Sequence, residues 1–171
     1  KQLLTLAREQ VKAGFDIEIL YLKGNPELKN EFEGAGATVN PMLAEISFLR
    51  QISLLRKHLL CKGNFVHAHL PRAELLAALS CHKNAFIFSR HNAESFWPGA
   101  PRFLSILLSR FVAIRAARGI AISDAVKKFV LSNLEITHRY PFDVVHYGFD
   151  THRDRNGRRV NHFSASISKS S

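Results

Sequence analysis

The sequence contains very little cysteine, tryptophan and methionine, and it has no long hydrophobic run. Its two cysteines, Cys61 and Cys81, both fall in helical, half-apolar stretches, which argues against a disulfide-stabilised scaffold and fits a reduced compartment. The most apolar run, residues 103–114, is interrupted by Arg110 and is shorter than the roughly 20 residues that a membrane-spanning helix needs. We therefore expect a cytoplasmic globular protein.

Acidic residues are also scarce, because 14 aspartates and glutamates stand against 24 lysines and arginines, which leaves a net charge of +10. This balance indicates an anionic partner such as phosphate groups, anionic lipid or nucleic acid, or simply a solvated basic surface. The arginines are spread over several predicted elements, and no nucleic-acid-reading module is present, so we expect no nucleic-acid partner. A basic, non-catalytic α/β module that binds nucleic acid or an anionic membrane remains the alternative. The sequence has no G-x-S-x-G nucleophile motif.

Helical and strand patterns alternate along residues 1–150. Apolar periodicity and capping residues predict helices over 1–13, 27–33, 47–62, 71–79, 101–118 and 124–133, and strands over 15–22, 38–41, 65–69, 85–89, 119–122 and 143–147. This alternation predicts an α/β fold, with an open parallel sheet and helices on both faces. Residues 151–171 are rich in serine and arginine and carry too few apolar residues to form a core, so we predict a disordered basic tail.

Polar side chains gather where two of the predicted strands end, in residues 65–92. The first strand carries His67 and His69, and the second is followed by Arg90, His91 and Asn92. Ligands of open parallel sheets bind beyond the carboxyl ends of the strands, so this stretch predicts a ligand site.

The three histidines of this stretch allow several interpretations. His67 and His69 lie on one face of a strand, and together with His91 they match the ligand set of a zinc site. No carboxylate is spaced to complete such a site, so we expect no metal there. We also expect no cofactor. The histidines otherwise line a polar cleft or satisfy one another structurally at the strand ends. Near neutral pH, a histidine such as His91 can hold a hydroxyl group or transfer a proton.

Four motifs occur in a characteristic order and spacing: H-A-H-L-P at 67–71, S-R-H-N at 89–92, G-I-A-I-S-D-A-V-K at 119–127 and V-V-H-Y-G-F-D at 144–150. Together they resemble the N-terminal domain of family 4 glycosyltransferases, and the resemblance covers residues 1–150. Those are retaining enzymes of the GT-B fold, with two Rossmann-like domains and an active site in the cleft between them. The resemblance therefore implies a Rossmann-like sheet for this chain.

The resemblance also implies a function, because in that family the N-terminal half holds the acceptor and the C-terminal half holds the nucleotide-sugar donor. The chain would be the acceptor-binding half of a retaining enzyme that transfers a sugar to a hydroxyl of a glycan, lipid or small molecule. The resemblance assigns His91 a catalytic role. It assigns acceptor binding to His69, Arg72, Glu74 and Arg90. We expect His67 and Asn92, which lie at the same strand ends, to bind the acceptor as well.

The sequence departs from the family pattern at both ends. The first strand of the family, its glycine-rich loop and the donor domain are absent, so the resemblance implies a truncated fragment that is inactive alone. Without the first strand, the strands predicted over 15–22 and 65–69 lack their shared neighbour, which predicts an exposed apolar slot.

The predicted helix over 101–118 has two interpretations. Its arginines and apolar stripe, together with the lipid-linked acceptors of many relatives, suggest a peripheral contact with the inner face of the cell membrane. We favour an ordinary core-packing helix, whose stripe is formed by Phe103, Leu107, Phe111 and Ile114. Trp97, in the preceding loop, either stacks on a sugar ring, touches lipid headgroups or anchors that loop.

Overall fold

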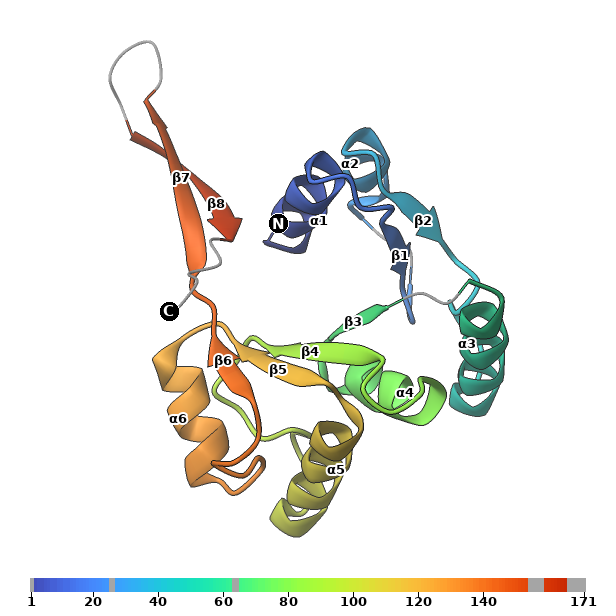
Figure 1. The fold of residues 1–171 in the computed structure, drawn as a ribbon, viewed down its shortest axis with the longest axis vertical. Coiled ribbons are helices and arrows are strands. Elements are labelled where there is room, and N and C mark those ends of the chain that lie inside the picture. The colour runs from blue at the N-terminus through green and yellow to red at the C-terminus, as the bar shows by residue number, and fades with distance from the viewer. Residues whose placement is uncertain (1, 25–26, 63–64, 154–158, 166–171) are drawn as a thin grey trace. The chain divides into compact units, whose positions relative to one another are not determined.

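The computed structural model describes the whole chain except residues 1, 25–26, 63–64, 154–158 and 166–171 (Figure 1). The chain forms two compact units, the first made of Lys1–Ile46 and His146–Ser171 and the second of Ser47–Val145. None of the described helices combines the length and the hydropathy that crossing a bilayer requires.

The first unit contains a small parallel sheet. Helix α1 (Gln2–Lys12) precedes β1 (Glu18–Leu20), and helix α2 (Lys29–Gly34) precedes β2 (Thr38–Asn40). β1 and β2 pair in parallel, and the core of the unit is built around Ala7, Phe32, Ala37 and Val39. No strand ladder in the described residues joins β1 to the sheet of the second unit. The apolar slot stays a prediction.

The C-terminal residues of the first unit form a hairpin of β7 (Tyr147–Arg153) and β8 (Arg159–Ala165). The register pairs residues 151–153 with residues 159–161 in an antiparallel ladder. The disordered basic tail expected over residues 151–171 stays a prediction. Residues 154–158 and 166–171 of the predicted tail lie outside the described residues.

The second unit contains a four-stranded parallel sheet in the order β3-β4-β5-β6. Its strands are β3 (Val66–His69), β4 (Phe86–Arg90), β5 (Arg118–Ala121) and β6 (Phe142–Val144). Its helices are α3 (Phe48–Lys62), α4 (Pro71–Ser80), α5 (Arg102–Arg115) and α6 (Asp124–Ser132). The predicted parallel α/β fold is confirmed, and Ser123 caps α6 by accepting a hydrogen bond from the Val126 N–H.

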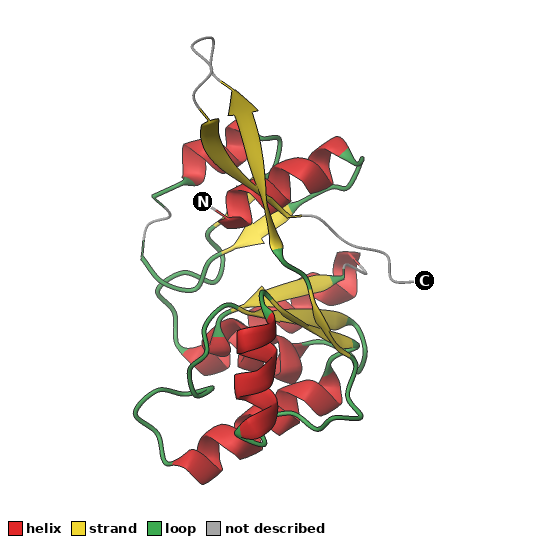
Figure 2. Ribbon diagram, turned by 90° about the vertical axis from the view of Figure 1, so that its left-hand side faces the viewer, coloured by secondary structure: helices red, strands yellow, loops and turns green. Residues whose placement is uncertain are grey.

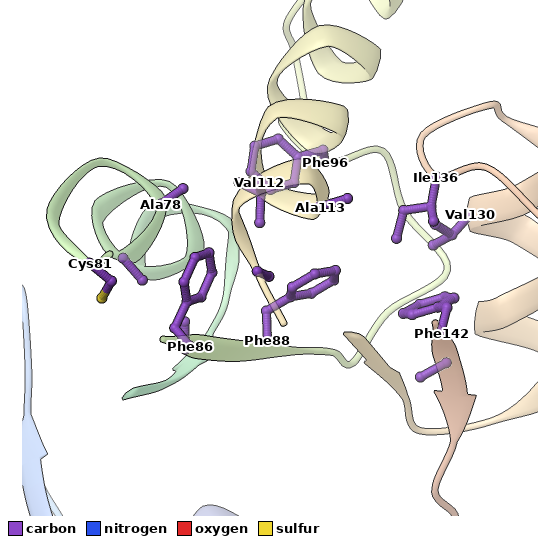
Figure 3. Packing of buried hydrophobic residues seen from close by; sticks show 14 of the residues in the cluster. Ala78, Cys81, Phe86, Phe88, Phe96, Val112, Ala113, Val130, Ile136 and Phe142 are labelled. Carbon is purple, nitrogen blue, oxygen red and sulfur yellow. The ribbon is translucent and has the colours of Figure 1, made fainter. Parts of the chain in front are cut away.

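The core of this unit lies between one face of the sheet and helices α4, α5 and α6 (Figures 1 and 2). Figure 3 shows Phe86 and Phe88 projecting from β4 toward α4 and α5, while Phe142 of β6 packs near Val130 of α6. Since side chains alternate along a strand, residues between these phenylalanines face the other side of the sheet.

Gly119 of β5 makes this packing possible. A Cβ atom at this position would lie 2.7 Å from ring atoms of both Phe88 and Phe142. These two rings stack with centroids 6.2 Å apart across β5, so the glycine leaves the space that the aromatic layer occupies.

The prediction that the apolar stripe of α5 packs on the core is wrong. Phe103, Leu107 and Ile114 are 60–67% exposed, and the face that packs on the core carries Ser105, Ser109, Val112 and Ala113 instead. The two serines are buried because each has a polar partner. Ser109 Oγ accepts a hydrogen bond from Arg90, and Ser105 Oγ bonds to the backbone of Trp97.

Candidate functional site

Three imidazole rings and one hydroxyl meet at the carboxyl ends of β3 and β4. His69 Nδ1 lies 3.0 Å from His91 Nε2, and His67 Nε2 lies 2.8 Å from Ser89 Oγ. The ring centroids are 4.1 Å apart for His67 and His69 and 5.3 Å apart for His69 and His91. We refer to His67, His69, Ser89 and His91 as the histidine cluster.

Strand register explains why these residues meet. β3 and β4 pair in parallel, with His67 opposite Ile87 and His69 opposite Ser89. This register puts the side chains of His67, His69 and Ser89 on one face of the sheet. Ala68, between the two histidines, points into the core instead. His91 follows the last residue of β4 and so comes beside His69.

The environment keeps the three rings neutral near pH 7. Burial, and secondarily the neighbouring His91, lowers the pKa of His67 to about 4. Burial, and then the neighbouring rings, lowers the pKa of His69 to about 3, and burial lowers the pKa of His91 as well. A neutral imidazole has one N–H donor and one acceptor nitrogen, so in the His69–His91 bond one ring donates and the other accepts. The histidine cluster can therefore hydrogen-bond an uncharged hydroxyl group.

The same geometry bears on metal binding. The nitrogens of His69 and His91 face each other, and a nitrogen of His67 faces Ser89. Within the part of the chain that the structure describes, no group of three or more His, Cys, Asp or Glu residues is arranged to hold a metal ion.

The turn after β3 has an unusual backbone. Leu70 has φ 75° and ψ 149°, a conformation that favours glycine and strains a residue with a Cβ. It joins His69 directly to Pro71, the first residue of α4. Residues held in such conformations are concentrated at functional sites, and here the strain lies next to the histidine cluster.

Two of the predicted acceptor residues lie around this turn and the end of β4. Arg72, in the first turn of α4, donates to Gln51 Oε1 at 3.1 Å and lies over the Phe48 ring at 5.2 Å. Both of these contacts are with α3. Asn92 is exposed in the loop directly after His91.

The other two predicted acceptor residues, Glu74 and Arg90, form a buried ion pair. Arg90 Nε lies 2.9 Å from Glu74 Oε2, and Arg90 Nη1 lies 3.2 Å from Glu135 Oε2. The Arg90 guanidinium also lies 4.5 Å from the Phe96 ring centroid. Glu74 is fully buried and Arg90 is 5% exposed, so an acceptor cannot touch either side chain in this arrangement.

Arg90 was expected to line the ligand site at the end of β4, but its side chain points into the core. The side chains of β4 alternate between the two faces of the sheet. Phe86, Phe88 and Arg90 face the core, and Ser89 lies on the opposite face as part of the histidine cluster. The apolar run of β4 is continuous, so the sequence does not show which side of the strand faces the core, and it identifies neither the inward direction of Arg90 nor Ser89. No signal in the sequence identifies Glu135, because its partner lies 45 residues away.

Burial governs the two carboxyl groups around Arg90. It raises the pKa of Glu74 to about 7, although the positive charge of Arg90 opposes the shift. Burial also raises the pKa of Glu135, which is opposed by a hydrogen bond from the Phe96 N–H and by Arg90. The ion pair is therefore required to keep these carboxyl groups ionised inside the protein.

The buried network also holds the loop that contains His91. Arg90 fixes the start of this loop, and Glu135 Oε1 accepts a hydrogen bond of 2.8 Å from the Phe96 N–H at the other end. Both contacts go to the same glutamate, so residues 91–95 are held between two points of one network. Glu135 and Arg90 are thus placed to position His91.

Comparison with known proteins agrees with the fold. The family model described as Glycosyltransferase Family 4 matches residues 1–153. In the other two comparisons, no curated protein and no solved structure matches the chain. The matched region contains both the parallel sheet and the histidine cluster. The chain therefore belongs to Glycosyltransferase Family 4.

Proposed function

We propose that the chain is the acceptor-binding half of a retaining glycosyltransferase, which moves a sugar from a nucleotide-sugar to a hydroxyl of a glycan, lipid or small molecule. The observation that carries this proposal is the uncharged histidine cluster at the carboxyl ends of β3 and β4. Neutral rings match the hydroxyl groups of a sugar, and ligands of parallel sheets bind at this edge.

The residues take different roles in this proposal. His91 orients the acceptor hydroxyl, and its hydrogen bond with His69 fixes which ring nitrogen carries the proton. Asn92 and Arg72 contribute to the rim of the acceptor site. Glu74 and Arg90 are positioning residues, because they are buried beneath the loop that carries His91.

The donor needs a different environment. A nucleotide-sugar carries a negatively charged diphosphate, whereas the rings of the histidine cluster are neutral and Arg90 is paired with two glutamates. The resemblance to family 4 assigns the donor to a second Rossmann-like domain. On this proposal the chain alone does not transfer sugar, and the intact enzyme acts in the cytoplasm, in contact with the inner face of the cell membrane where the acceptor is lipid-linked.

A glycan and glycolipid array tests the proposal. We expect the labelled chain to retain a discrete set of ligands and to lose them in the His69→Ala and His91→Ala variants. His82→Ala is the matched control, since His82 is an exposed histidine of the same unit outside the histidine cluster. Far-UV circular dichroism confirms that each variant is folded. Unchanged retention in both cluster variants would contradict the proposal.

A second candidate rests on charge. Residues 47–145 contain 14 lysines and arginines but only 5 aspartates and glutamates, so they carry +9 of the net charge of +10. This favours a basic module that binds anionic partners. Salt-dependent binding to DNA, without any glycan retention, would support this candidate over the first.

A further inference from the structure

A pocket of about 500 Å³ lies in the second unit, at the opposite edge of the sheet from the histidine cluster. It is formed by the second half of α3, the end of α4, the residue before β4 and the last residue of α5. Cys81, which Figure 3 labels at the end of α4, also lines it. Its volume is in the range of pockets that hold small molecules, about 300–1,000 Å³. We name it the amino-edge pocket and define it by Arg56, Leu59, Leu60, Leu79, Ala85 and Arg115.

The end of α4 holds the two arginines of this pocket. Arg56 donates from Nε and Nη2 to the Leu79 carbonyl oxygen, at 3.1 Å and 2.6 Å. Arg115 donates from Nε to the Ala78 oxygen at 3.0 Å and from Nη2 to the Cys81 oxygen at 2.6 Å. These carbonyl groups belong to one stretch of four residues, so they bring both guanidinium groups to the same helix end. A guanidinium has five N–H donors, so each group has further donors to offer.

The protein around the amino-edge pocket does not balance this positive charge. Residues 47–145 contain only five acidic residues, and none of them lines the pocket in the part of the chain that the structure describes. Three of the five pair with Arg90 or Arg118 elsewhere in the unit. The carboxyl end of a helix supplies only about −0.5 of a charge, whereas two guanidinium groups carry +2. Capping of α4 therefore leaves an excess positive charge, which a bound anion would neutralise.

Most of the remaining wall of the amino-edge pocket is apolar. Leu59 and Leu60 come from α3, Leu79 comes from α4, and Ala85 precedes β4. Leu60 is 74% exposed, and covering apolar surface is favourable by about 25 cal/mol per Å². The pocket thus combines a cationic end with an apolar wall. This combination matches a molecule that has an anionic head and an apolar body.

The thiol in the pocket favours binding over covalent chemistry. Burial raises the pKa of the Cys81 thiol to about 11, although the positive charge of Arg115 opposes the shift. The thiol therefore stays protonated near pH 7, and a protonated thiol is a poor nucleophile.

We propose that the amino-edge pocket binds an amphipathic anion, a small molecule in which a carboxylate or phosphate group is attached to an apolar body. The anionic oxygens lie between Arg56 and Arg115, because guanidinium N–H groups match the geometry of both kinds of oxyanion. The apolar body covers Leu59, Leu60 and Leu79. Since β4 is five residues long, this site lies about 17 Å along the strand from the histidine cluster, and it is separate from the proposed acceptor site.

Isothermal titration calorimetry of the full chain with simple probes tests the proposal. Octanoate and octyl phosphate are used below the concentrations at which they form micelles, so that only single molecules are offered. We expect saturable binding of at least one of them, and the tighter one identifies the head group. Octanol lacks the anion and inorganic phosphate lacks the apolar body, so each should bind at least about tenfold more weakly.

A paired substitution tests the role of the two arginines. Arg56→Gln/Arg115→Gln removes both positive charges and keeps an amide donor at each position. It should weaken probe binding at least about tenfold, because two charge-assisted hydrogen bonds are lost. Arg50→Gln/Arg102→Gln is the matched control, since it removes the same charge from exposed arginines of the same unit outside the pocket. The control should bind the probe as the wild type does.

A second variant leaves the cap of α4 intact. Leu60→Glu puts a carboxylate four residues after Arg56, where the two side chains are neighbours on the helix surface. This carboxylate competes with the probe for the Arg56 guanidinium, so probe binding should fall at least about tenfold. Leu49→Glu is the matched control, because Leu49 is 78% exposed on the same helix and does not line the amino-edge pocket. Thermal unfolding without probe checks that all variants are folded.

Three results would overturn the proposal. The first is the lack of saturable binding of both amphipathic probes to the wild-type chain. The second is binding of octanol as tight as that of octanoate and octyl phosphate, which would show that the anion contributes nothing. The third is equal affinity in a pocket variant and its matched control. None of these results depends on glycan retention, so this proposal and the proposed function fail independently.

Discussion

Replacing Arg90 by methionine should destabilise the protein strongly and in a pH-dependent way. Methionine fills much of the same space but removes the cation that faces Glu74 at 2.9 Å and Glu135 at 3.2 Å. Leaving partners of a buried ion pair without their opposite charge costs about 3–5 kcal/mol. Domains of this size have a free energy of unfolding of about 5–15 kcal/mol, so this loss is a large fraction of the total.

The pH dependence follows from the carboxyl groups. The pKa of Glu74 is already raised to about 7, and removing the positive charge of Arg90 raises it further. A protonated carboxyl group needs no cation, so the destabilisation should be greater near pH 8 than near pH 5.5. Adding Glu74→Gln to Arg90→Met removes one of the two buried charges and should restore part of the stability near pH 8.

Urea denaturation followed by far-UV circular dichroism at both pH values measures these differences. Arg118→Met is the matched control, because its partner Asp143 and Arg118 itself are both exposed, and exposed pairs contribute only about 0–1 kcal/mol. A loss below about 1 kcal/mol for Arg90→Met, or an equal loss at both pH values, would refute the reasoning.

Three further predictions concern stability. Gly119→Ala should lower the free energy of unfolding by about 1–3 kcal/mol in thermal or urea unfolding, because its Cβ would clash with two buried phenylalanine rings. Leu70→Gly should raise this free energy by about 1 kcal/mol, since glycine adopts φ 75° without strain; a lower stability would contradict the strain. The pKa values of His67 and His69 lie below the unfolded value, so their contribution to stability is present above pH 6.5 and is lost as the pH falls toward 4 and 3. Between pH 6.5 and pH 4.5, His67→Gln/His69→Gln should therefore lose less stability than the wild type, by up to about 1.4 kcal/mol per pH unit for each histidine. Glu74 shifts in the opposite direction but is present in both proteins, so it affects both curves alike.

The order of the elements and the parallel sheet could be predicted from the sequence. Apolar runs such as the one in β4 are typical of buried parallel strands, and the polar residues that end these strands indicated where the histidines meet. The predicted helix over 101–118 ends earlier, at Arg115, because the chain becomes extended at Ala116 before it enters β5 at Arg118.

The orientation of α5 could not be predicted, because periodicity shows that a helix has an apolar face but not which neighbour covers it. Here Arg90 and Trp97 supply partners to Ser109 and Ser105, and these contacts turn the serine face inward. Both partners are distant in sequence or lie in a loop, so no local pattern contains them. The role of Glu135 could not be predicted for the same reason, because its partner Arg90 is distant in sequence.

The most direct test of the central claim is imidazole nitrogen NMR of the ¹⁵N-labelled chain during titration with the glycan that the array retains best. If the histidine cluster holds the acceptor, the ring resonances of His69 and His91 should move in a saturable way, while those of the exposed His82 stay constant. Saturable glycan binding that leaves the His69 and His91 resonances unchanged would contradict the account.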